Sequence, residues 1–288
     1  MNIAVIYGFL GAGKTTLIRH LLSTSVAPGQ VAVLVNDFGK INVDGATLSG
    51  EHVQVMPLSS GCICCSLSGA FVPAIEELNS KWGPEWLVIE PTGVAAPFAL
   101  EALIRGQRLA PIANLACVVT IVDANRFLAY RPKLGEFYTA QVQQADLVLI
   151  NKVDLVSVAQ LTATEAALRE LNPTSRLLAT KFGAVDWPAL LSISSSGAQT
   201  NGHVDAPEFE TADLALAPQT QAELEARFAA INAGTYGRIY RAKGIALIDG
   251  APWLINYVDG RLDVEPIKAS PTSLTIIGHD LDLSAWPT

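Results

Sequence analysis

The stretch Gly8-Phe-Leu-Gly-Ala-Gly-Lys-Thr15 decides the fold class of this chain. It follows the apolar run 2–7 and precedes leucines at helical spacing, Leu17, Leu21 and Leu22. The spacing G-x-x-x-x-G-K-[ST] between a strand and a helix is typical of a phosphate-binding loop, because its glycines let backbone amides turn towards phosphate oxygens at a helix N-terminus. The alternative, an ordinary glycine-rich turn, does not explain the Lys-Thr pair.

Each residue of this loop has an expected role. We expect Lys14 to neutralise the β- and γ-phosphates and the Thr15 hydroxyl to bind Mg²⁺. The nucleotide contacts that we expect from the loop come from Gly8, Gly11, Ala12, Gly13, Lys14, Thr15 and Thr16.

Short apolar runs alternate with helical patterns through the first two-thirds of the chain. Strands are expected at 2–7, 31–35, 53–57, 86–89, 116–122, 147–150 and 176–179, and helices at 71–81, 98–104, 136–144 and 159–171. This alternation predicts an α/β fold of the P-loop NTPase type, with a mostly parallel sheet and helices on both faces.

The composition changes after residue 191. Residues 192–210 are poor in apolar periodicity and predict a linker. Residues 211–288 contain a helical pattern at 218–231 and strand-like runs at 237–248, 252–258 and 273–277, separated by Asp-Gly pairs. We therefore expect a P-loop domain at 1–191 and a small C-terminal α+β domain at 211–288.

A second motif indicates which nucleotide is bound. Asn151-Lys-Val-Asp154 follows the strand 147–150, at the sheet edge where ligands bind in such folds. The Asp154 carboxylate can accept hydrogen bonds from N1–H and the 2-amino group of guanine, whereas adenine offers it neither. Asn151 is expected at the other purine edge and the Lys152 stem on the purine face. The motif favours GTP over ATP. Residues 180–183, after the next expected strand, are candidates for a second contact with an edge of the base.

Two acids follow strands and are expected at the same edge. Glu90 begins Glu90-Pro-Thr-Gly93, in which the acid would orient the Mg²⁺ shell and Gly93 would present its amide to the γ-phosphate. Capping of a strand-to-helix turn is the alternative for Glu90. Asp37 follows the strand 31–35 and is a candidate for a water on Mg²⁺, for the hydrolytic water or for a second metal. The expected catalytic residues are Lys14, Asp37 and Glu90.

Three of the four cysteines, Cys62, Cys64 and Cys65, lie within four positions. Cys62 and Cys64 point to one side if the segment is extended. Three thiolates with an open fourth position suit Zn²⁺, Cu(I) or a similar transition metal. Buried inert thiols and a redox-sensing disulfide are the alternatives. Cys117, isolated in an apolar strand, is expected in the core.

Composition excludes several classes of protein. Of the 288 residues 50% are hydrophobic, which excludes global disorder, and the net charge of −8 argues against broad binding to nucleic acid or an anionic membrane. No apolar run approaches the roughly 18–20 residues of a membrane span. The clustered cysteines and an N-terminus without a basic patch favour a cytoplasmic protein.

In their order along the chain, these motifs resemble the CobW-type GTPases, relatives of the nickel-insertion GTPases UreG and HypB. The C-terminal stretches 240–244 and 276–282 add to the resemblance. The resemblance implies a slow GTPase that binds a transition metal at its cysteines, Zn²⁺ before Co²⁺ or Ni²⁺. It also implies delivery of the metal to a client metalloprotein or cofactor-synthesis enzyme, and it is compatible with a homodimer that depends on nucleotide or metal.

The chain departs from the family pattern at three points. Asp37 stands where many relatives carry Glu, which leaves open whether it serves Mg²⁺ or the transition metal. The histidines are scattered, without the His-rich tract of many relatives. The sequence stops soon after Asp282 without an expected closing helix, which predicts an apolar surface for a partner.

The cysteines lie between the two acidic segments, which suggests a mechanism. GTP with Mg²⁺ would draw Asp37 and residues 90–93 inward and fix the thiols, and hydrolysis would relax them. The rival hypothesis is a regulatory binding module in which metal occupancy controls a partner and no metal is transferred. A small-molecule kinase is disfavoured by Asp154.

Overall fold

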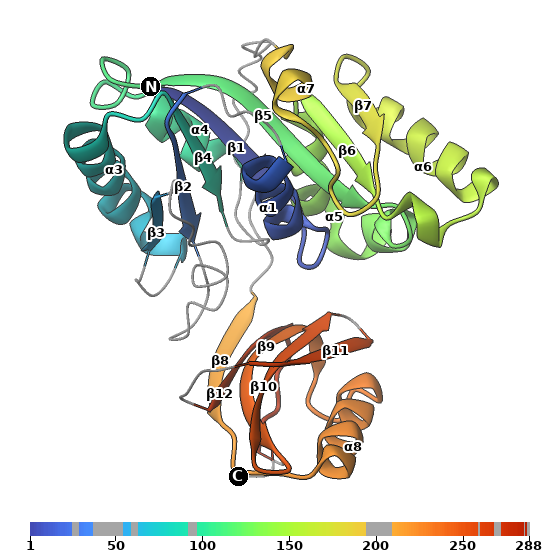
Figure 1. Ribbon diagram of the computed structural model, residues 1–288. Helices are drawn as coiled ribbons and strands as arrows, with labels where there is room; N and C mark the ends of the chain where they lie inside the picture. The colour runs from blue at the N-terminus through green and yellow to red at the C-terminus, as the bar shows by residue number, and fades with distance from the viewer. Residues whose placement is uncertain are drawn as a thin grey trace. The chain divides into compact units, whose positions relative to one another are not determined.

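The computed structural model describes residues 1–24, 29–36, 54–58, 63–91, 97–193, 209–258, 260–267, 272–284 and 286, with backbone alone for 24, 36, 54–58, 63–70, 97 and 98. These residues form two units, one up to residue 193 and the other from residue 209 (Figure 1). Most of the expected linker lies outside the described residues, so the domain boundaries stay a prediction.

The first unit contains a seven-stranded sheet in the order β3-β2-β4-β1-β5-β6-β7, in which every pairing of neighbouring strands is parallel. The strands are β1 (Asn2–Tyr7), β2 (Val31–Asn36), β3 (Gln54–Leu58), β4 (Trp86–Glu90), β5 (Asn114–Asp123), β6 (Leu147–Asn151) and β7 (Arg176–Ala179). The expected strands are confirmed, with ends that differ by one or two residues. Because the strands are parallel, all their carboxyl ends lie at one edge of the sheet.

Helices cover both faces of this sheet (Figure 1). They are α1 (Lys14–Thr24), α3 (Ile63–Trp82), α4 (Pro97–Arg105), α5 (Phe127–Gln143), α6 (Val158–Leu171) and α7 (Trp187–Leu191), with a 3₁₀ turn η1 (Val153–Leu155). The expected helix at 136–144 begins earlier, at Phe127, and is interrupted at Gly135, where φ is 56°. The α/β class with helices on both faces is confirmed.

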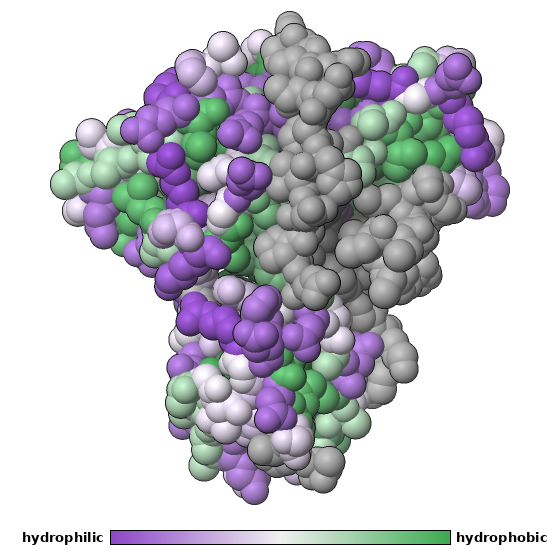
Figure 2. Space-filling view, turned by 180° about the vertical axis from the view of Figure 1, so that it is seen from behind, coloured by the Kyte–Doolittle hydropathy of each residue, from purple (hydrophilic) through white to green (hydrophobic). Residues whose placement is uncertain are grey.

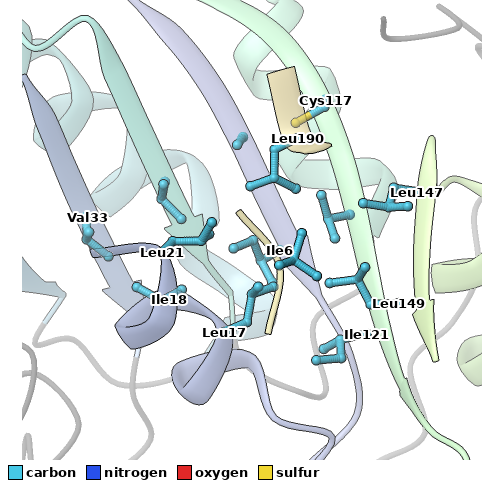
Figure 3. Close-up of a cluster of buried hydrophobic side chains, with 14 of the residues drawn as sticks. Ile6, Leu17, Ile18, Leu21, Val33, Cys117, Ile121, Leu147, Leu149 and Leu190 are labelled. Carbon is cyan, nitrogen blue, oxygen red and sulfur yellow. The ribbon is translucent and has the colours of Figure 1, made fainter. Parts of the chain in front are cut away.

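The alternation of side chains along β1 builds two cores. Ile6 packs towards Leu17, Ile18 and Leu21 of α1 (Figure 3), whereas Val5 lies on the opposite face, in the core that also contains side chains of α3 and α4. This period of two is what a strand covered on both faces requires. The cores hold α1 firmly at the carboxyl end of β1, and the loop between them is thereby fixed at that edge.

The second unit is a five-stranded antiparallel sheet in the order β11-β10-β9-β12-β8. Its elements are β8 (Glu210–Ala215), α8 (Gln221–Asn232), β9 (Arg238–Ile248), β10 (Ala251–Val258), β11 (Arg261–Pro266) and β12 (Ser273–His279). Phe228 and its neighbours on α8 pack on one face of the sheet. At the β9–β10 turn Asp249 and Gly250 have φ values of 49° and 81°, which confirms the predicted Asp-Gly hairpin.

The surface of the described residues is mixed in character. Hydrophilic and hydrophobic side chains are interspersed over the face shown in Figure 2. A search of the described helices finds none with the length and apolar character needed to cross a membrane.

Candidate nucleotide site

The glycines of the phosphate loop allow it to lie directly against the sheet. Gly8 has φ 151°, and a Cβ there would stand 2.5 Å from the carbonyl oxygen of Ile121 in β5. Gly13 has φ 115°, and a Cβ there would collide with the side-chain amide of Asn151. A side chain at either position is therefore excluded by both conformation and space. The loop is seated on the ends of β5 and β6.

Lys14 is 5% exposed and bends back over this loop. Its Nζ donates to the carbonyl oxygen of Gly8 at 2.8 Å and to that of Phe9 at 3.5 Å. The ammonium group is thus held at the first turn of α1, next to the amides that the loop presents. A phosphate at this helix N-terminus would meet a positive charge that is already in place.

Thr15 and Glu90 come together from α1 and from the end of β4. The Thr15 hydroxyl donates to Oε1 and Oε2 of Glu90 at 3.1 and 3.2 Å, and Glu90 is 7% exposed. Hydroxyl and carboxylate oxygens are the ligands that Mg²⁺ prefers. The donor set therefore fits a magnesium ion, and Glu90 contacts the phosphate-loop helix as well as ending its own strand.

Asn151 connects the base-recognition segment to the phosphate loop. Its Nδ2 donates to the carbonyl oxygen of Ala12 at 2.8 Å, and its Oδ1 accepts from the backbone amide of Gly183 at 3.0 Å. Asn151 is 2% exposed, so these bonds are shielded from water. One amide hydrogen and one oxygen lone pair remain for the purine edge that we expected it to hold. Its main structural role is that of a bridge, which the sequence did not predict.

The rest of the segment lies at the surface of the same edge. Asp154 is exposed in η1, directly after β6. The amide of Val153 donates to the carbonyl oxygen of Thr180 at 3.3 Å, so the expected second edge, 180–183, does lie beside this segment. The Lys152 ammonium lies 2.7 Å from Asp123 Oδ2, at the end of β5. Asp123 was not predicted as a site residue. Its position at the carboxyl end of a buried strand is the feature of the sequence that could have identified it.

Several expected site residues lie outside the described residues: Asp37, Cys62 and Gly93. The strand register still places their neighbours. Val35 pairs with Glu90 in β4, and Asn36 pairs with Leu58 in β3. The strands that precede the Asp37 and cysteine segments therefore end at the same edge as Glu90.

Cys64 and Cys65 lie in the first turn of α3, which begins at Ile63. The extended geometry considered for Cys62 and Cys64 thus does not hold from Ile63 onward, because the backbone there is helical. Among the side chains that the structure describes, no group of three His, Cys, Asp or Glu is arranged to hold a metal, and the three clustered cysteines are not among those side chains.

Cys117 is confirmed as a core residue. It is 1% exposed and its sulfur lies among aliphatic side chains of β5, β6 and α7 (Figure 3). Burial, and then the charge of Asp146, raises the pKa of its thiol to about 12. Since metals bind the thiolate form, this cysteine is inert as a ligand.

The loop on β1, the acid at the end of β4 and the Asn-Lys-x-Asp segment after β6 together define a P-loop nucleotide-binding protein with a GTPase fold. The family model described as "CobW/HypB/UreG, nucleotide-binding domain" matches residues 2–179, and that of the CobW C-terminal domain matches residues 215–286. The chain belongs to the CobW/HypB/UreG family.

Similar proteins are known in bacteria and eukaryotes. A zinc chaperone CobW from Pseudomonas aeruginosa is 29% identical over 347 residues, covering 99% of this chain and 89% of that protein. A zinc-regulated GTPase metalloprotein activator 1 from Dictyostelium discoideum is 26% identical, covering 67% of this chain and 48% of that protein. The Zn(II)-bound YjiA GTPase from E. coli has a TM-score of 0.52 at 22% identity, covering 98% and 95% of the two chains, and supports the fold.

Proposed function

We propose that this protein is a cytoplasmic GTP-hydrolysing metallochaperone that binds Zn²⁺ at its cysteine cluster and delivers it to a client protein. The observation that carries the nucleotide part is the 2.8 Å bond from Asn151 to the carbonyl oxygen of Ala12. It joins a segment able to recognise guanine to a loop able to bind phosphates. The names of the relatives, zinc chaperone and zinc-regulated GTPase, support the metal part.

The residues of the site divide the work of hydrolysis. Lys14 and the loop amides bind the β- and γ-phosphates, and Asp154 accepts from guanine N1–H and the 2-amino group. Mg²⁺, held by Thr15 and Glu90, would neutralise charge on the phosphates. Water attacks the γ-phosphorus, the bond to the β-phosphate oxygen breaks, and GDP and phosphate leave with one proton passing to solvent. We assign the orientation of this water to Asp37. As the family resemblance implies, we expect slow turnover.

The metal is the cargo of this cycle. Cys62, Cys64 and Cys65 would hold it as thiolates, with a fourth position left for the client's ligand. An incomplete ligand set favours transfer, because a closed four-ligand site would hold the metal too long. Zn²⁺ is proposed before Co²⁺ and Ni²⁺.

Nucleotide and metal would be coupled through the edge of the sheet. Glu90 of β4 pairs with Val35 of β2, which lies two positions before Asp37. The cysteine segment follows β3, and β3 is the other neighbour of β2 in the sheet. Binding of GTP with Mg²⁺ would fix the segments that follow β2 and β4. We propose that this fixes the thiols, and that hydrolysis releases them.

An exchange of base specificity tests the nucleotide part. The substitution Asp154→Asn places a donor where xanthine carries a carbonyl in place of the 2-amino group of guanine. We expect GTP binding to weaken about 100-fold, because the asparagine NH₂ meets the 2-amino group as donor against donor and the bond from N1–H loses its charged acceptor. XTP binding should strengthen. Unchanged preference for GTP over XTP would overturn the guanine assignment.

A transfer assay tests the metal part. Protein loaded with one Zn²⁺ is mixed with an apo zinc enzyme that reports its own activation, with GTP or with GDP. We expect activation that needs GTP hydrolysis and is lost in the Cys64→Ala/Cys65→Ala variant. Cys117→Ala is the matched control, because that thiol is buried and protonated. Zn²⁺ binding without any transfer would instead favour the regulatory binding module.

A further inference from the structure

Asp123 occupies a central position between the base segment and the phosphate loop. It is the last residue of β5, and its side chain is 9% exposed. Oδ2 lies 2.7 Å from the Lys152 ammonium, whereas Oδ1 accepts from the backbone amide of Asn125 at 2.9 Å. The turn after β5 therefore fixes one carboxylate oxygen and leaves the other to hold the lysine.

Lys152 has an uncommon backbone conformation, and the pair with Asp123 orders its side chain. Its φ and ψ are 63° and 35°, in the left-handed region that a lysine seldom adopts. A free lysine side chain loses up to about 2 kcal/mol of conformational free energy when it is ordered. Because the ion pair orders Lys152 before any ligand arrives, that cost does not fall on nucleotide binding.

Asp123 also has a basic neighbour, and aromatic side chains of the phosphate loop and α5 lie close by. Arg126 Nε lies 3.9 Å from Asp123 Oδ2, and Arg126 also donates to the Tyr130 hydroxyl at 3.0 Å. Phe9 of the phosphate loop packs edge-on against Tyr130 and Tyr138, with ring centroids 5.4 and 5.7 Å away. The charge of Asp123 contributes, after burial, to a raised pKa of Tyr138. The carboxylate is largely shielded from water, so its attraction to Lys152 is screened less than at an open surface.

We propose that Asp123 is a positioning residue for purine binding: it holds the Lys152 ammonium so that the lysine stem is preorganised against the face of the base. This inference rests on the proposed function and adds to it a residue that sets nucleotide affinity without touching the nucleotide. Its effect must pass through Lys152, and this requirement makes it testable.

The test is a double-mutant cycle on GDP affinity, with a fluorescent GDP as the probe. Asp123→Asn keeps an oxygen for the Asn125 amide and removes the charge. We expect about a tenfold loss of affinity, the range of one hydrogen bond to a charged group, through faster GDP dissociation. Lys152→Met should cause a similar loss, and Asp123→Asn should add nothing in the Lys152→Met background.

Controls separate positioning from folding. Glu170→Gln breaks the exposed 3.2 Å pair with Arg131 and should leave GDP affinity unchanged. Thermal unfolding without nucleotide checks each variant, and Asp123→Ser, whose hydroxyl can accept from the same amide, repeats the cycle if the Asn variant does not fold.

Two results would overturn the inference: affinity of Asp123→Asn within twofold of wild type, or an equal loss in both Lys152 backgrounds. The proposed GTP function is tested separately by comparing wild-type affinity for GDP and ADP. A preference for ADP would refute GTP recognition, and the cycle could then be repeated with ADP because a lysine stem packs on any purine.

Discussion

The hydroxyl of Thr15 lies 3.1 Å from Oε1 of Glu90, although the two residues are 75 positions apart in the chain. The contact joins the first turn of α1 to the end of β4, which also pairs with β2. It places a hydroxyl and a carboxylate beside the phosphate loop, and the carboxylate lies on β4, whose neighbour β2 precedes Asp37. Glu90 therefore lies in the nucleotide site and pairs with the strand that precedes Asp37.

Glu90→Gln should uncouple hydrolysis from nucleotide binding. Glutamine can still accept from the Thr15 hydroxyl, but it lacks the negative charge that attracts Mg²⁺. We expect phosphate release to slow about 100-fold, with a higher Mg²⁺ requirement, as for other losses around a bound metal. The measurement is phosphate release from saturating GTP across a magnesium titration. GDP binding without Mg²⁺ serves as the control and should not change, and a wild-type magnesium profile would refute the assignment.

Two glycines with similar positive φ angles should differ in their tolerance of alanine. Gly183 has φ 63°, and a Cβ there would stand 2.8 Å from the Cα of Leu17 in α1, whereas Gly135 has φ 56° and nothing within 4 Å of a Cβ. Gly135→Ala should cost about 1–3 kcal/mol of unfolding free energy through backbone strain alone, because φ 56° with ψ −142° is a conformation that residues with a Cβ rarely adopt. Gly183→Ala should cost about 3 kcal/mol or more, because backbone must also move.

Urea denaturation measures this difference, and GDP binding adds a second readout. The Gly183 amide donates to Asn151, so GDP affinity should fall in Gly183→Ala and stay unchanged in Gly135→Ala. Equal destabilisation of both variants would mean that the 180–183 loop does not press on α1 in solution.

Glu101 on α4 should make stability depend on pH. Burial raises the pKa of this carboxyl to about 7, Arg105 opposes the shift and Asp146 adds to it; its Oε1 has no hydrogen-bond partner among the described residues. The folded state therefore binds a proton that the unfolded state, with a value near 4.5, has released. Stability should fall as pH rises from about 4.5 to 7, by up to about 3 kcal/mol.

Glu101→Gln removes this titration. We expect the variant to show a flatter profile than wild type, measured as the free energy of unfolding in urea at pH 5 and pH 8. The free energy of unfolding of Glu101→Gln, relative to that of wild type, should be higher at pH 8 than at pH 5. A difference between variant and wild type that stays constant with pH would show that Glu101 is ionised in the folded state.

Local patterns were sufficient to predict the parallel sheet. Strands such as β1 and β6 are continuous apolar runs because both faces are covered, and a run of that kind is visible without any tertiary information. β11 was not predicted because most of its side chains are exposed and it lacks an apolar signal. The short helix α7 is stabilised by the Asp186 cap and by the burial of Trp187. It was not predicted, because five residues are too few to show a helical repeat of apolar side chains.

The sequence motifs of the site could be predicted, but the contacts between them could not. The sequence identified Lys14, Thr15, Glu90 and the Asn151–Asp154 segment, because each has a local pattern. The bridge from Asn151 to Ala12 and the pair between Lys152 and Asp123 depend on strand order, which brings β5 between β1 and β6. The helical start at Ile63 could not be distinguished from an extended segment by the spacing of the cysteines.

The central claim is that nucleotide and metal bind cooperatively, and an anaerobic Zn²⁺ titration in the nucleotide-free, GDP-bound and GTP-analogue-bound states tests it most directly. We predict at least about tenfold tighter Zn²⁺ binding with the analogue, and tightening of the analogue by Zn²⁺ by the same factor. The coupling should vanish in Cys64→Ala/Cys65→Ala and persist in Cys117→Ala. Equal Zn²⁺ affinity in all three states would contradict the account.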